Sequence, residues 1–192
     1  GLLALAPEIM STLFGYGRFT TQDALFSAQS LRAYALGLPA FVLIKVLSPG
    51  FFAHGDTKTP VRIGFFTLAL NLALNLSLYR PLAHVGPPLA SALAAIVNMM
   101  LLGIILYRRD VFHPDKRLID RLVRMTAASA LMAVVVLMVA RTVTPGLILW
   151  HGLARAAALG ALMIVAGFIY LAALSILGVA TPRSVLGKLR RR

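Results

Sequence analysis

Five long stretches of apolar residues constrain what this chain can fold into. At about 1.5 Å of helical rise per residue, each is long enough to cross about 30 Å of membrane hydrocarbon. The stretches run from Leu31 to Phe52, Val61 to Tyr79, Pro88 to Tyr107, Leu122 to Ala140 and Leu153 to Leu177. Only 13% of the residues are charged, against about a quarter in soluble domains. The sequence therefore predicts an all-α transmembrane fold with five complete membrane-spanning helices.

A sixth apolar segment, from Gly1 to Phe14, is too short to cross the membrane by itself. The segment starts without Met, and it has neither the basic region nor the small-residue cleavage pattern of a signal peptide. We therefore expect a truncated chain whose first helix is partial and continues upstream.

The distribution of basic residues predicts how the spans are oriented. Cytoplasmic loops of membrane proteins collect Lys and Arg. With the five spans above, thirteen basic residues fall on one side of the membrane, five fall on the other, and Lys45 lies inside a span. The thirteen lie in the connections around Asp56 and Asp110 and in the C-terminal tail. We therefore expect a multi-pass protein with its C-terminus in the cytoplasm.

The C-terminal tail, residues 178–192, is strongly basic and includes Lys188, Arg190, Arg191 and Arg192. Such a run could bind RNA or a protein partner, but a basic run directly after a cytoplasmic helix end is usually held by anionic lipid. The remaining basic residues are split among short loops between apolar spans. We therefore expect membrane lipids, and no nucleic acid, as partners.

No residue pattern in the sequence predicts an enzyme. The chain has no cysteine, and its four histidines lie far apart in predicted loops. There is no nucleotide-binding loop, no metal-ligand spacing and no nucleophile elbow. The sequence therefore predicts no catalytic residue, no cofactor and no metal.

The first complete span carries a lysine and two prolines. Pro39 and Pro49 each remove a backbone hydrogen bond, so we expect the helix to bend. Lys45 lies fourteen residues after Leu31, about 21 Å along a helix. A lysine at this depth usually faces a pathway or an ion pair, although it could also contact the backbone or snorkel to the headgroups. Because side chains tilt toward the helix N-terminus, snorkelling is disfavoured and Lys45 is predicted to face a cavity.

Thr67, Asn71 and Asn75 occupy every fourth position of the next span and so share one helix face. We expect this polar face to point inward. Hydrogen bonding between helices is the simpler interpretation, and contact with a substrate is the alternative. Asn98 on the following span is interpreted in the same way. The candidates for a substrate cavity are therefore Lys45, Thr67, Asn71 and Asn75.

The segment from Leu13 to Ile63 resembles the C-terminal lobe of the MurJ/MviN family of lipid II flippases. The resemblance rests on YALGLPAF (Tyr34 to Phe41), KVLSPGFF (Lys45 to Phe52) and DTKTPV (Asp56 to Val61), the last containing a cytoplasmic loop motif of Asp56, Thr57, Lys58, Thr59 and Pro60. Elsewhere the agreement lies in hydropathy and span count. His54 departs from the basic residue expected just before the Asp-Thr pair.

The resemblance implies a two-lobe transporter fold of the multidrug/oligosaccharidyl-lipid/polysaccharide exporter superfamily. Residues 1–107 would then be core helices of the C-terminal lobe, 108–121 a cytoplasmic loop, and 122–177 the last two helices with a candidate groove for a lipid tail. The implied function is translocation of an undecaprenyl-linked peptidoglycan precursor, lipid II, across the bacterial inner membrane by alternating access. The arginines that hold the precursor's diphosphate in this family would lie mainly on an N-terminal lobe of the same full-length protein.

Two other functions are compatible with the sequence. One is a polysaccharide-lipid or drug exporter of the same superfamily, which the motifs between Tyr34 and Val61 disfavour. The other is a non-transporting membrane scaffold, which the two prolines and Lys45 disfavour because a scaffold seldom needs a cation inside the membrane.

Overall fold

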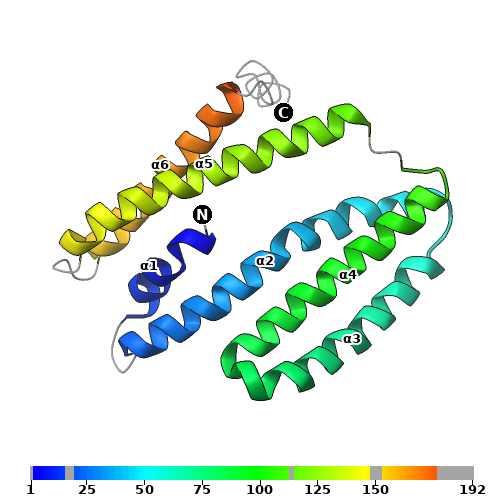
Figure 1. The fold of residues 1–192 in the computed structure, drawn as a ribbon, viewed down its shortest axis with the longest axis horizontal. Helices are drawn as coiled ribbons and strands as arrows, with labels where there is room; N and C mark the ends of the chain where they lie inside the picture. Colours follow the sequence, from blue (N-terminus) through cyan, green and yellow to red (C-terminus); the bar gives the residue numbers. More distant parts are fainter. Residues whose placement is uncertain (1, 16–19, 113–114, 148–152, 177–192) are drawn as a thin grey trace. The chain divides into compact units, whose positions relative to one another are not determined.

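The computed structural model describes residues 2–15, 20–112, 115–147 and 153–176. These residues form α-helices and one short 3-10 helix, η1, and no strand occurs among them (Figure 1). The elements are α1 (Leu2–Phe14), α2 (Thr21–Phe52), α3 (Lys58–Leu82), η1 (Ala83–Val85), α4 (Gly86–Arg108), α5 (Lys116–Leu147) and α6 (Leu153–Ile176). The predicted all-α fold is confirmed.

Four helical runs in the described residues are long and apolar enough to cross a membrane. They are Thr21–Phe52, Lys58–Arg108, Lys116–Val139 and Ala157–Ile176. The second run has 51 residues and contains α3 and α4, which the sequence predicts as two separate spans. α1 has 13 residues and is shorter than the roughly 20 residues of a span.

α2 begins ten residues earlier than the apolar pattern predicts. Thr20 and Asp23 form a capping box, in which the Asp23 N–H donates to Thr20 Oγ1 (3.2 Å) and the Thr20 N–H donates to Asp23 Oδ2 (2.9 Å). These bonds satisfy backbone donors at the helix start. The helix then continues through Pro39 and Pro49 to Phe52. Capping chemistry, which an apolar pattern does not contain, sets where α2 starts.

α5 also extends beyond the predicted span of residues 122–140. Asp115 precedes the helix and accepts the Leu118 N–H on Oδ1 (2.7 Å), so the helix starts at Lys116. Residues 116–121 are therefore helical rather than part of the predicted loop. The helix ends at Leu147, past Pro145, near which the sequence predicts a connection.

The chain divides into two compact units, one made of most of α1 with α5 and α6, and one made of residues 14–113. In the first unit α5 and α6 lie side by side (Figure 1). Ala128 of α5 forms a buried cluster with Ala173 and Leu174 of α6, and Tyr170 packs against it. The second unit contains all the candidate cavity residues.

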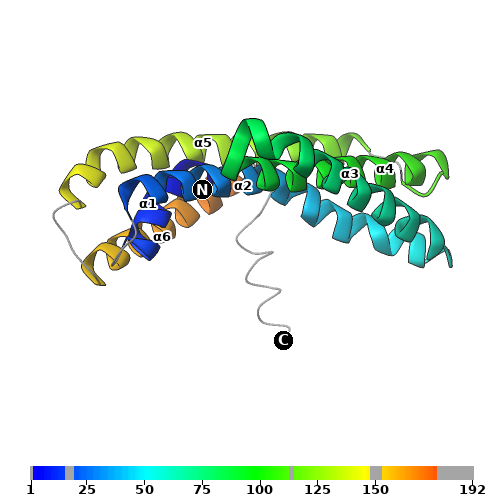
Figure 2. The same ribbon diagram turned by 90° about the horizontal axis from the view of Figure 1, so that it is seen from below.

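In the second unit α4 packs against both α2 and α3, as Figures 1 and 2 show from two directions. Small side chains make this packing close. Ala92, Ala94 and Ala95 of α4 are buried, and a Cβ added at Gly37 of α2 would lie 2.8 Å from the Cα of Ala92. Small residues let helix backbones approach in this way, so Gly37 is needed for the contact between α2 and α4.

Candidate functional site

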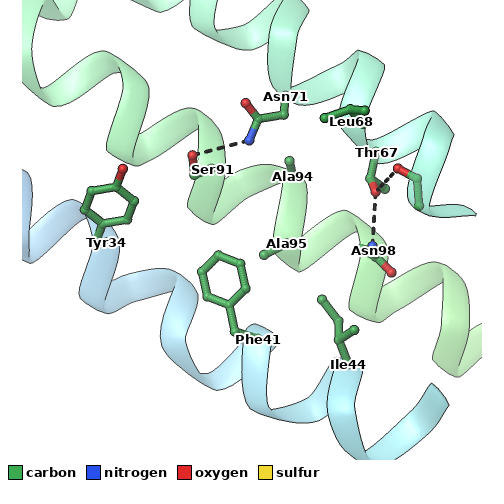
Figure 3. Close-up of a pocket in the computed structure, with 11 residues that line it drawn as sticks. Tyr34, Phe41, Ile44, Thr67, Leu68, Asn71, Ser91, Ala94, Ala95 and Asn98 are labelled. Carbon is green, nitrogen blue, oxygen red and sulfur yellow. Dashed lines mark hydrogen bonds between the residues drawn. The ribbon is translucent and has the colours of Figure 1, made fainter. Parts of the chain in front are cut away.

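An open groove with a volume of about 460 Å³ runs along the second unit. All three long helices of the unit line it, and no charged side chain is among its lining residues. The side chains that line it are Tyr34, Phe41 and Ile44 of α2, Thr67, Leu68 and Asn71 of α3, and Ser91, Ala94, Ala95 and Asn98 of α4 (Figure 3). We call this feature the polar groove.

Hydrogen bonds between α3 and α4 form one wall of the polar groove. The Asn98 amide donates to Thr67 Oγ1 (3.0 Å), and the Asn71 amide donates to Ser91 Oγ (3.3 Å). Thr67, which is only 5% exposed, in turn donates to the Gly64 carbonyl (3.1 Å). Such bonds between membrane helices contribute about 0.6 kcal/mol each on average. The wall therefore holds α3 to α4 with modest strength.

Asn75 lies one turn beyond Asn71 and is not among the residues that line the polar groove. Its amide donates to Asn71 Oδ1 (2.6 Å) and to the Asn71 carbonyl (3.0 Å). Thr67 and Asn71 therefore reach the groove directly, and Asn75 acts on it through Asn71. These contacts give the three residues a packing role, and their contact with a substrate stays a prediction.

Lys45 is exposed on α2. Within the described part of the chain the structure records no hydrogen bond or ion pair for its ammonium. Phe41, four residues earlier, lines the polar groove, and residues four apart lie on the same side of a helix. Lys45 is thus one turn beyond Phe41 and directly follows Ile44, which also lines the groove, although Lys45 itself is not among the lining residues. Pro49 lies one further turn along the same continuous helix.

The cytoplasmic loop motif predicted from the sequence forms the turn between α2 and α3. Asp56 accepts the Thr59 N–H on Oδ1 (2.9 Å) and the Thr59 hydroxyl on Oδ2 (2.6 Å). Thr57 and Lys58 are exposed, and Pro60 lies in the first turn of α3, where its missing N–H costs little. Asp56 therefore satisfies a backbone donor in the first turn of α3, whereas the N-cap residue Thr57 makes no side-chain cap bond.

Arg109, at the end of α4, joins this turn. Its guanidinium donates to Asp56 Oδ2 and to Thr59 Oγ1 (3.2 Å), and it lies 5.6 Å from the ring centroid of Phe51. The hydrogen bonds from Thr59, and then the bond from Arg109, hold the pKa of Asp56 well below its usual range. We call Phe51, Asp56, Thr59 and Arg109 the turn cluster.

An apolar cluster lies next to the turn cluster. The ring of Phe51 is 1% exposed and packs with Ile63, Leu102 and Leu106. From the sequence, Arg109 is only one of several basic loop residues. It lies 53 residues from Asp56, so no local pattern links the two; only the return of α3 and α4 as a hairpin brings them together.

At the opposite ends of α3 and α4, His84 attaches η1 to the first turns of α2. Its Nε2–H donates to Gln29 Oε1 (3.0 Å), its carbonyl accepts the Ser30 hydroxyl (3.0 Å), and its ring centroid lies 4.5 Å from that of Phe26. The sequence assigned no role to this histidine. Together with the turn cluster, this contact ties α2 to both ends of the α3–α4 hairpin.

The structure bears little on two of the predictions, those for the basic tail and for a metal site. The tail residues Lys188, Arg190, Arg191 and Arg192 lie outside the described residues. Among the residues that the structure does describe, no group of three or more His, Cys, Asp or Glu is placed to hold a metal ion.

Comparison with known proteins gives consistent matches along the chain. A family model described as lipid II flippase MurJ matches residues 1–156. A Vibrio cholerae protein named "Probable lipid II flippase MurJ" is 36% identical over 179 residues, which cover 93% of this chain and 34% of that protein. A Rhizobium tropici protein of the same name is 32% identical over 194 residues, covering 100% and 36%.

A third relative, "Lipid II flippase MurJ" of Burkholderia cenocepacia, is 32% identical over 132 residues, which cover 69% of this chain and 26% of that protein. The chain thus spans about a third or less of the length of these relatives. The similarity extends well beyond the segment from Leu13 to Ile63 that carries the recognisable motifs.

Proposed function

The chain belongs to the lipid II flippase MurJ family, and we propose that it forms the C-terminal part of a flippase. The complete protein would move undecaprenyl-linked peptidoglycan precursor, lipid II, across the bacterial inner membrane by alternating access. The observation that carries this proposal is the extent of the match, which covers residues 1–156 of this chain and about a third of the relatives' length. An N-terminal lobe of the same protein would supply the rest of the central cavity.

We propose five membrane crossings for the complete helices of this chain. α3 has 25 residues and α4 has 23, so each is long enough to cross by itself, and η1 connects them. The excess of Lys and Arg in the connections next to Asp56 and Asp110 supports a cytoplasmic location for the turn cluster and for the C-terminus. His84 and the start of α2 would then lie on the periplasmic side.

No covalent chemistry is part of the proposed function. Alternating access requires that a polar headgroup site open first to one side and then to the other while the polyprenyl chain stays in lipid. Lys45, Thr67, Asn71 and Asn75 are the proposed cavity residues of this chain. Membrane lipids would contact the spans, residues 122–177 would provide the groove for the lipid tail, and Lys188, Arg190, Arg191 and Arg192 would bind anionic headgroups.

Lys45 offers a direct test, because an exposed ammonium inside a span needs an aqueous or anionic partner. In the complete protein, Lys45→Ala and Lys45→Gln should both impair complementation of a flippase-depleted strain, while Lys45→Arg should retain part of it because the charge is kept. Translocation of labelled lipid II in vesicles should follow the same order. Val46→Ala, which alters the adjacent 64%-exposed side chain, is the matched control and should grow normally.

Two results would contradict these proposals separately. If the complete wild-type protein neither supports growth of the depleted strain nor translocates lipid II at normal membrane levels, the flippase function is wrong. If the wild type is active and Lys45→Ala is equally active, only the cavity role of Lys45 is wrong. A scaffold would tolerate every Lys45 substitution that keeps the protein in the membrane.

A further inference from the structure

The polar groove has two chemically different sides. Figure 3 shows the rings of Tyr34 and Phe41 along the α2 side, the side chains of Asn71 and Asn98 along the other side, and Ala95 between them. Tyr34 is 48% exposed and Phe41 38% exposed, so both rings are accessible in this unit. The groove therefore combines aromatic faces, a smooth methyl-lined floor and amide and hydroxyl groups.

This combination matches one kind of ligand better than others. An anionic phosphate would find no cation among the lining residues, and a polyprenyl chain would cover hydroxyl and amide groups without offering them hydrogen bonds. A sugar ring has an apolar face of C–H groups, which suits the negative face of an aromatic ring, and an edge of hydroxyl and amide groups, which suits Asn, Ser and Tyr side chains.

We propose that the polar groove binds an uncharged sugar ring of the lipid-linked precursor, with the ring stacked on Phe41, on the side toward Tyr34, and its polar edge toward Asn71 and Asn98. This inference rests on the proposed flippase function. The volume of about 460 Å³ lies within the roughly 300–1,000 Å³ of small-molecule sites, so the groove accommodates a sugar but not the whole precursor.

The position of Lys45 is consistent with this orientation. It follows Phe41 by one helical turn, which is about 6 Å along α2. A sugar stacked on Phe41 would therefore bring a phosphate attached to it toward the Lys45 ammonium. The neutral groove would then bind the sugar, and the exposed lysine would bind the adjacent phosphate of the same headgroup.

The alternative occupant of the groove is another helix of the complete protein. Photo-crosslinking distinguishes the two. The complete protein is prepared with para-benzoylphenylalanine in place of Tyr34 or, as the matched control, in place of Phe66, an aromatic residue on α3 that is 56% exposed and outside the groove. Each is irradiated in nanodiscs with radiolabelled lipid II or with radiolabelled undecaprenyl phosphate, which carries no sugar.

We expect a crosslink to lipid II at position 34, none to undecaprenyl phosphate at that position, and none to lipid II at position 66. Equal labelling by undecaprenyl phosphate would show that the groove holds lipid chain, and a crosslink within the protein itself would show that a helix fills it. Either result, or no crosslink to lipid II at all, overturns the proposal.

Binding measurements provide a second readout. Phe41→Ala should weaken lipid II binding about tenfold, equivalent to about 1.4 kcal/mol, and Phe41→Trp should restore it, while binding of undecaprenyl phosphate stays unchanged. Phe66→Ala is the control. Unchanged lipid II affinity in a correctly folded Phe41→Ala variant contradicts the sugar site but leaves the flippase function intact. If the wild type binds no lipid II, both proposals fail. Should Phe41→Ala not fold, the crosslink at position 34 decides.

Discussion

The polar groove and the turn cluster are built from the same three helices but hold them in different ways. In the turn cluster a carboxylate and a guanidinium meet beside a phenylalanine ring that is 1% exposed. In the polar groove the contacts between helices are neutral amide–hydroxyl bonds of 3.0 and 3.3 Å, and two aromatic rings remain accessible. The side chain that carries the guanidinium is 45% exposed, so the ion pair adds only modestly, and the buried Phe51 ring is what fixes the unit most firmly at its turn.

This difference suits the alternating-access transport proposed above. A lobe that moves as a rigid body needs strong contacts between its helices at their ends. A headgroup site needs side chains that can exchange a hydrogen bond within the protein for one to the ligand. The neutral bonds of the polar groove contribute about 0.6 kcal/mol each, so a ligand's hydroxyl groups can replace them, whereas no ligand group replaces the buried contacts of Phe51 in the turn cluster. In the complete protein in detergent, substitutions in the turn cluster should therefore lower stability more than substitutions in the polar groove.

The largest effect is expected for Phe51→Ala. The ring is fully buried against Ile63, Leu102 and Leu106, and removing a buried Phe costs about 3–5 kcal/mol of the free energy of unfolding. The matched control is Phe52→Ala, because Phe52 is adjacent in sequence but 53% exposed. Thermal unfolding of the two variants measures the difference. Equal melting temperatures of the two variants would show that the buried ring of Phe51 does not stabilise the unit at its turn.

The sequence predicted the helical fold and the place of the turn, because apolar runs of membrane length and a Gly-Asp-Thr-Lys-Thr-Pro segment carry local signals. It also predicted that Thr67 and Asn71 share a face, since helical periodicity alone requires this. It did not predict that Arg109 meets Asp56 or that Tyr34 and Phe41 border a groove. Both depend on how α4 packs between α2 and α3, which no single-helix pattern contains.

The second-largest loss of stability is expected when the charge of Asp56 in the turn cluster is removed. Asp56→Asn keeps an oxygen that accepts the Thr59 N–H but removes the charge that Arg109 contacts, so we expect a lower melting temperature, with a smaller decrease than for Phe51→Ala. The matched control is Asp120→Asn, which breaks the exposed Asp120–Arg124 pair on α5. Exposed pairs of this kind contribute little, so this variant should unfold like the wild type.

The lowered pKa of Asp56 also makes the free energy of unfolding depend on pH. Folding lowers the pKa of Asp56. The ionised carboxylate therefore contributes fully to stability above the pKa of the unfolded chain, about 3.9. This contribution is lost as the pH falls below that value toward the folded pKa. The wild type should therefore lose more stability than Asp56→Asn between pH 5 and pH 3. Parallel pH profiles would mean that the carboxylate gains nothing from Thr59 and Arg109 in the folded protein.

The smallest effect is expected in the polar groove, where a double-mutant cycle on Thr67 and Asn98 isolates one hydrogen bond between helices. Thr67→Val keeps the shape of the side chain and removes its hydroxyl, Asn98→Ala removes the donor, and the coupling free energy of the pair should be about 0.6 kcal/mol. The Asn71–Ser91 pair, at 3.3 Å rather than 3.0 Å, should couple no more strongly. A coupling of several kcal/mol at either pair would make the groove as rigid as the turn cluster. Its side chains would then be unable to exchange their bonds for those of a ligand, and the distinction between a fixed turn and an adaptable groove would have to be abandoned.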